Sequence, residues 1–82
     1  MRVDKYLKVS RLIKRRTVAS ESCDKGRIFV NGREAKPATA VKPGDEIRIT
    51  FGTKTVAVKV VATPEHVRAE EASTLYTVVE EV

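Results

Sequence analysis

The first 26 residues carry apolar side chains at helical spacing. From residue 3 to about residue 12, basic residues surround a less polar face that consists of Val3, Tyr6, Leu7 and Ser10. Positions three or four apart share one side of an α-helix, so this pattern predicts an amphipathic helix. Thr17 is expected to cap a second helix, because a threonine oxygen accepts a backbone N–H at the first turn. Gly26 is expected to end that helix, since glycine adopts a positive φ angle at little cost.

After Gly26 the pattern changes to the period of two that is typical of β-strands. The predicted strands cover residues 27–30, 33–35, 46–51, 55–61 and 76–79. Asn31-Gly32 is a strong hairpin-turn sequence and joins the first two strands. The polar stretch 64–73 is expected to be irregular or briefly helical. This order of elements predicts an α+β fold in which the two N-terminal helices pack on a small, mainly antiparallel sheet.

The length of 82 residues fits one small domain, residues 1–82. Such a small core argues against an enzyme, and the sequence contains neither a nucleophile elbow nor a glycine-rich phosphate loop. Cys23 is the only cysteine, so no internal disulfide forms, and together with His66 it is too little for a four-ligand zinc site. We expect Cys23 to pack in the core. We also expect the protein to bind no metal and no cofactor. No stretch has the pattern of a membrane span or a secretory signal, which predicts a cytoplasmic protein without membrane contact.

Charge is unevenly distributed along the chain. The net charge is +5, but residues 1–42 hold twelve bases and four acids, whereas residues 43–82 hold four bases and seven acids. The two parts therefore carry +8 and −3. Concentration of one sign of charge at one end favours a polyanionic partner.

Eight N-terminal residues are the candidate nucleic-acid contacts. They are Arg2, Lys5, Lys8, Arg11, Lys14, Arg15, Arg16 and Thr17. The first helix should place its bases next to the basic corner at residues 14–16. Thr17 is expected to start the next helix, with backbone N–H groups free to meet a phosphate. The arginines are the better candidates for fixing orientation, because a guanidinium binds phosphate through two donors.

Structured RNA fits this composition better than other nucleic acids. Two Tyr, two Phe and no Trp provide no cluster for stacking single-stranded bases. Base-reading amide side chains are also scarce, since the chain has no Gln and its Asn31 belongs to a turn. Structured RNA offers mainly phosphates and 2′-hydroxyls. Two other interpretations stay open: a merely solvated basic helix face, and a protein-interaction module that adds its valine-rich strands to a partner's sheet.

Several short motifs, in one order and spacing, resemble the S4-type RNA-binding domain over residues 1–51. They are Arg2–Leu7, Lys14–Ala19, Gly26–Ile28, Val30–Gly32, Lys36–Pro37 and Val41–Asp45. Residues 52–82 would add further strands and an acidic tail. More narrowly, the run from Arg2 to Thr17, the short length and the stretch Ala72–Thr77 resemble the RqcP group of stand-alone bacterial S4-type proteins.

This resemblance implies a role in ribosome-associated quality control. Proteins of the group bind large ribosomal subunits obstructed by peptidyl-tRNA and contact both ribosomal RNA and tRNA. They hold the tRNA in the P-site position while an RqcH-type tailing factor adds C-terminal alanines. The resemblance further implies a monomer without catalytic activity, with Arg2 and Arg16 as the first-rank RNA contacts. The alternative within the family is the heat-shock S4-type protein that acts on stalled large subunits; it carries a long basic C-terminal extension, whereas this chain ends acidic.

Overall fold

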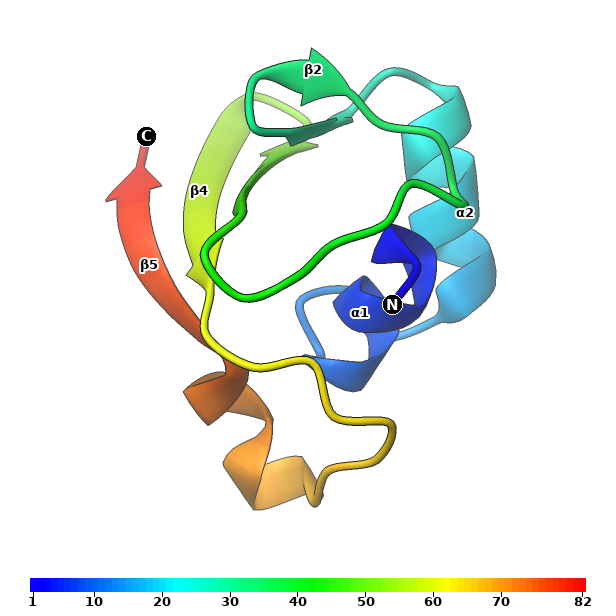
Figure 1. The fold of residues 1–82 in the computed structure, drawn as a ribbon. Coiled ribbons are helices and arrows are strands. Elements are labelled where there is room, and N and C mark those ends of the chain that lie inside the picture. Colours follow the sequence, from blue (N-terminus) through cyan, green and yellow to red (C-terminus); the bar gives the residue numbers. More distant parts are fainter.

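The computed structural model covers residues 1–82 and contains one antiparallel sheet beside two helices (Figure 1). The elements are α1 (Val3–Val9), α2 (Arg16–Asp24), β1 (Ile28–Val30), β2 (Arg33–Glu34), β3 (Glu46–Phe51), β4 (Lys54–Val60), the 3-10 helix η1 (Ala69–Leu75) and β5 (Tyr76–Glu81). The strand order is β2-β1-β3-β4-β5, and all four pairings are antiparallel. The predicted α+β fold, with N-terminal helices on a small antiparallel sheet, is confirmed.

Helix α1 is shorter than predicted. It ends at Val9 rather than near Leu12, because Arg11 adopts a left-handed backbone with φ 62°. The side chain of Ser10, which is buried, donates to the carbonyl of Leu7, and the Ile13 N–H donates to the same carbonyl at 3.1 Å. The chain therefore folds back under the helix and buries Ile13 in the core.

Helix α2 begins at Arg16, and its N-cap lies two residues before the predicted one. Arg15 occupies the N-cap position with an extended backbone and makes no side-chain cap, so the prediction that Thr17 caps the helix is wrong. The first helical bond runs from the Ala19 N–H to the Arg15 carbonyl at 3.1 Å, which places Thr17 inside the first turn. Gly26 follows the helix with φ 71°, as predicted.

The core lies between the helices and one face of the sheet. It comprises Val3, Tyr6, Leu7, Ile13, Ala19, Cys23, Ile28, Val30, Ala35, Val41, Ile47, Ile49, Val58, Val60 and Leu75. Pairing of β1 with β3 joins the two predicted hairpins, with Val30 opposite Ile47. On the other face, Arg48 donates to Glu80 at 2.7 Å, and both of these side chains reach solvent. Cys23 is buried among core residues, which confirms its packing role.

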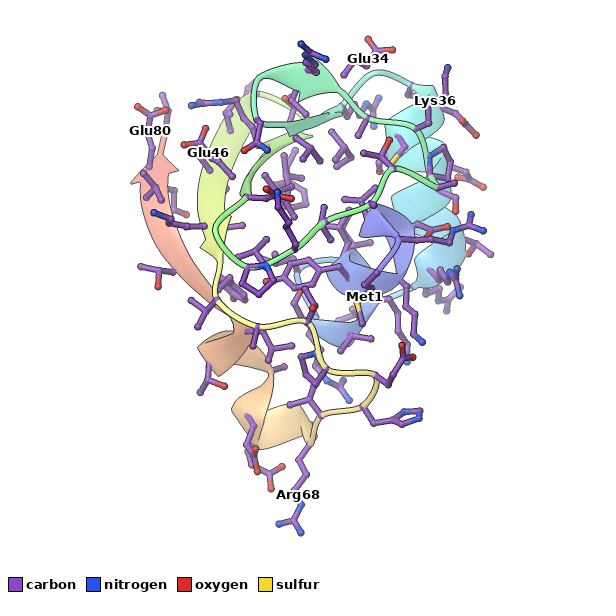
Figure 2. All side chains as sticks on the ribbon, viewed as in Figure 1. Met1, Glu34, Lys36, Glu46, Arg68 and Glu80 are labelled. Carbon is purple, nitrogen blue, oxygen red and sulfur yellow. The ribbon has the colours of Figure 1, made fainter.

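The stretch between β4 and β5 is irregular up to Arg68 and then forms η1, as predicted. Figure 2 shows Arg68 at the far end of this excursion, away from the sheet. The buried Tyr6 hydroxyl donates to the Leu75 carbonyl at 2.7 Å, across 69 positions of sequence. This bond fixes η1 against α1, the helix that carries the first candidate contacts.

Candidate nucleic-acid interface

A buried carboxylate lies at the centre of the basic surface. The side chain of Asp4 is 2% exposed, although both arginines that it binds reach solvent. Arg2 donates to it through Nε at 3.2 Å and Nη2 at 3.0 Å, and Arg16 donates through Nη2 at 3.4 Å. The Ser20 hydroxyl and the Lys5 backbone N–H donate at 3.0 and 2.7 Å. One buried anion thus holds Arg2 and Arg16 side by side.

The Asp4 carboxylate stays ionised in this setting. Burial by itself raises the pKa of a carboxyl group, but the hydrogen bonds from Ser20, Arg16, Arg2 and the Lys5 backbone outweigh burial and hold the pKa of Asp4 below its usual range. An acid in the first turn of a helix is explained by the helix dipole alone, so no local pattern indicated that Asp4 would be buried and bound by residues from α2.

The start of α1 is fixed by the loop that precedes β3. The Val3 N–H donates to the Thr39 carbonyl at 2.7 Å, and the Val41 N–H donates to the Met1 carbonyl at 2.8 Å. The backbone of Arg2 forms an isolated antiparallel β-bridge with Ala40. The backbone of Arg2 is therefore held at both sides, and its half-exposed guanidinium is presented from a rigid position.

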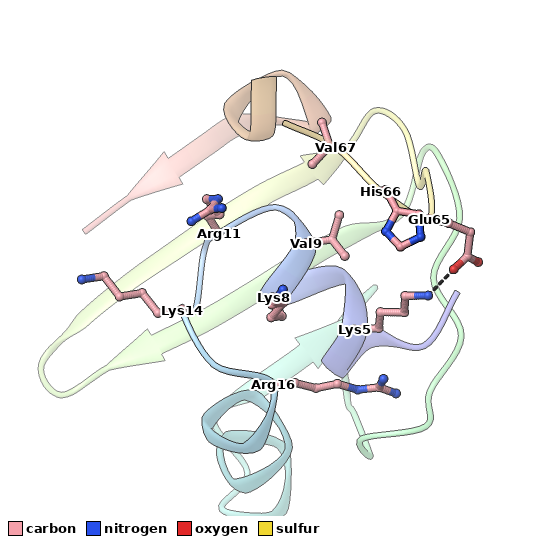
Figure 3. A pocket seen from close by; sticks show the side chains of 9 residues that line it. All are labelled: Lys5, Lys8, Val9, Arg11, Lys14, Arg16, Glu65, His66 and Val67. Atoms are coloured by element: carbon pink, nitrogen blue, oxygen red, sulfur yellow. Dashed lines mark hydrogen bonds and ion pairs between the residues drawn. The ribbon is translucent and has the colours of Figure 1, made fainter. Parts of the chain in front are cut away.

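Five of the eight predicted contacts line one cavity of about 320 Å³ beside α1 (Figure 3). These five are Lys5, Lys8, Arg11, Lys14 and Arg16. Figure 3 shows Lys5 and Arg16 extending in the same direction, while Lys14 points away from them. The turn at Arg11 brings the second half of the basic stretch back toward the helix. Such a surface is suited to bind several phosphates of one folded polyanion.

The remaining predicted contacts lie outside the cavity. Arg2 joins the group through Asp4, which it shares with Arg16. Arg15 and Thr17 are exposed at the start of α2 and line no cavity. Their proposed contact with RNA stays a prediction.

The opposite wall of the cavity comes from residues that the sequence did not indicate. Glu65, His66 and Val67 in the loop after β4 line it, and the Lys5 ammonium group donates to the Glu65 carboxylate. This bond lowers the pKa of Glu65. The contact spans 60 positions of sequence, so no local pattern could have revealed it.

The structure contains no group of three or more His, Cys, Asp and Glu side chains placed to hold a metal ion. Its helices are too short and too polar to cross a bilayer.

Comparison with known proteins places this arrangement in a family. The family model described as S4 domain matches residues 1–47. The chain belongs to the S4 domain family. The match includes Arg2, Asp4 and Arg16 but stops before the loop that carries Glu65.

Two relatives extend the likeness over nearly the whole chain, and both are named RQC P-site tRNA stabilizing factor. The protein from Halalkalibacterium halodurans is 62% identical over 81 residues, covering 99% of this chain and 92% of the relative. The protein from Bacillus subtilis is 53% identical over 81 residues, covering 99% and 94%. The resemblance to the RqcP group of S4 proteins is therefore confirmed.

A solved structure shares the fold. The trimeric structure of heat shock protein 15 from Vibrio cholerae superimposes with a TM-score of 0.88 at 30% identity, covering 96% of this chain and 81% of that one. The likeness extends beyond the matched segment to β4, η1 and β5.

Proposed function

We propose that this protein is an RNA-binding factor of ribosome-associated quality control. In this role it binds the large ribosomal subunit obstructed by peptidyl-tRNA and stabilises the tRNA in the P-site position. The observation that carries the proposal is the cavity beside α1, which five cationic side chains line next to the Arg2–Asp4–Arg16 cluster. The names of its full-length relatives, at 62% and 53% identity, support the same role.

The mechanism that we propose requires no catalysis. A compact cationic surface that contacts ribosomal RNA and tRNA together lowers the repulsion between their phosphates and so favours one tRNA position. Guanidinium groups held by Asp4 lose little side-chain freedom on binding, because their orientation is set before the RNA arrives. An RqcH-type factor on the same cytoplasmic subunit would then add alanines to the nascent chain.

Sedimentation of tagged protein from a bacterial lysate tests this role. The wild type should co-migrate with large subunits that carry peptidyl-tRNA, and R16A and R2A should shift toward the top of the gradient. K59A is the matched control, because it removes the same charge as R16A. Lys59 is exposed on β4 and makes no ion pair. A wild type that stays at the top, or a K59A shift as large as that of R16A, would contradict the proposed site.

The likeness to heat shock protein 15 supports a second candidate, namely rescue of stalled large subunits without tailing. The two roles differ in their product. Deletion of the gene should abolish C-terminal alanine tails on stalled nascent chains under the first role. Tails that persist at the wild-type level, in cells that still require the protein on large subunits, would favour the second.

A further inference from the structure

We propose that the cavity between α1 and the loop Pro64–Val67 binds one backbone phosphate of the RNA, and that Glu65 occupies this subsite in the free protein. The inference rests on the proposed RNA-binding function and deepens it. It assigns a role to a loop that lies outside the matched S4 segment of residues 1–47.

Charge is the first argument for a phosphate. The cavity is lined by five cationic side chains and only one acidic one, and that acid is Glu65. Like charges gathered in one concave surface repel each other, and an anion among them offsets that repulsion. Glu65 supplies one negative charge through two oxygens, and so does a phosphodiester. Replacement of one by the other leaves the charge balance of the cavity unchanged.

The exposure of the Glu65 side chain is the second argument, because an exposed carboxylate is easily replaced by a phosphate at Lys5. The Lys5 side chain is 31% exposed, whereas the Glu65 side chain is 71% exposed. Glu65 can therefore swing into solvent without opening the core. An exposed ion pair of this kind shifts an equilibrium by about 1.5- to 5-fold, so it competes with RNA without preventing binding.

The loop that carries Glu65 has a defined position. Val67, two residues further on, packs against the hydrophobic core, and the Tyr6 hydroxyl holds the end of η1 through Leu75. Figure 3 shows the Glu65 and Lys5 side chains pointing toward each other. The carboxylate is thus placed at the lysine by the fold, rather than by a chance encounter of two flexible side chains.

The test compares two variants that change the net charge equally. E65Q removes the internal anion, and E70Q removes an exposed acid that lines no cavity and makes no ion pair. Binding is measured by co-sedimentation with purified large subunits carrying peptidyl-tRNA. We expect E65Q to lower the dissociation constant about two- to fivefold, and E70Q to change it by less than about half of that.

The same substitution in a K5M background shows whether Lys5 mediates the effect. E65Q should then have no more effect than E70Q, because the lysine that it frees is missing. Equal tightening by E65Q and E70Q in the wild-type background, or weaker binding by E65Q, would overturn the subsite while leaving the proposed function intact. Absence of binding by the wild type itself would refute the function and the subsite together.

Inorganic phosphate distinguishes RNA from a free anion as the ligand. Millimolar phosphate, added to parallel titrations of wild type and E65Q, should weaken both equally and slightly, because a free ion lacks the neighbouring nucleotides. Strong competition by phosphate in E65Q alone would show that the cavity takes a free anion and would overturn the assignment to RNA.

Discussion

Replacement of Asp4 by asparagine should destabilise the fold and weaken RNA binding at the same time. Asn keeps the size of the side chain, so it tests charge and hydrogen bonding without creating a cavity. Its oxygen can still accept from the Lys5 N–H, but its amide nitrogen faces the Arg2 guanidinium, where donor meets donor. The charge that holds Arg2 and Arg16 is lost.

The magnitude follows from the burial of Asp4 and the exposure of its partners. Loss of one member of a buried ion pair costs about 3–5 kcal/mol. Arg2 and Arg16 are 51% and 46% exposed, so water replaces part of what they lose, and we expect about 2–3 kcal/mol. An 82-residue domain has roughly 4–12 kcal/mol of stability, so the variant stays folded. Its melting temperature should fall by about 8–24 °C.

Thermal unfolding followed by circular dichroism at several pH values is the assay. The pKa of Asp4 is lowered from 3.8 in the folded protein, so its contribution to the free energy of unfolding is present above that value. The contribution disappears as the pH falls through the folded-state pKa. The gap between wild type and D4N should therefore be largest near neutral pH and should begin to narrow only below about pH 4.

D24N is the control, because it removes the same charge as D4N from Asp24, which is exposed at the end of α2. It should alter the free energy of unfolding by less than about 0.5 kcal/mol. For binding to large subunits, added positive charge alone predicts that both variants bind more tightly. Loss of arginine positioning predicts that D4N binds more weakly than D24N. Equal melting temperatures or equal affinities for D4N and D24N would refute this reasoning.

Two further predictions concern the core. Y6F removes the hydrogen bond from the Tyr6 hydroxyl to the Leu75 carbonyl, which still accepts the Val61 N–H. The free energy of unfolding should therefore drop by about 1 kcal/mol. An unchanged midpoint of urea unfolding would contradict the role given to that hydrogen bond. Burial raises the pKa of Tyr6 to about 12, so wild type should lose stability relative to Y6F as the pH rises above about 10 and through that value. Burial, together with the charges of Asp4 and Asp24, raises the pKa of Cys23 to about 11. Alkylation of Cys23 at neutral pH should therefore require unfolding. Rapid labelling of the native protein would contradict the burial of Cys23.

The sequence predicted most elements because local patterns determine them. The alternation around Ile47 and Ile49 identified β3, and Asn31-Gly32 identified the first hairpin, where both residues have positive φ angles of 52° and 82°. The end of α1 escaped prediction because Arg11, rather than a glycine, adopts the left-handed conformation there. That turn depends on the burial of Ile13, which is a tertiary effect.

The sequence predicted that these basic residues gather on one surface, but not how they are held there. A cluster of bases is visible in any count of charge, and five of the eight candidates do share a cavity. A count of charge does not show that Asp4 and Glu65 hold these bases in position. Asp4 acts from the core, and Glu65 acts from the loop between β4 and η1, so only the folded chain brings Asp4 to Arg16 and Glu65 to Lys5.

These two anions affect the basic surface in opposite ways, and burial explains the difference. Asp4 is 2% exposed and cannot leave, so it acts as a permanent anchor that fixes Arg2 and Arg16. Glu65 is 71% exposed and can leave, so it acts as a temporary partner of Lys5. If both roles hold, D4N and E65Q change the net charge by the same amount but move the affinity for RNA in opposite directions. A model that depends on net charge alone predicts the same direction for both, so this pair of variants separates positioned charge from total charge.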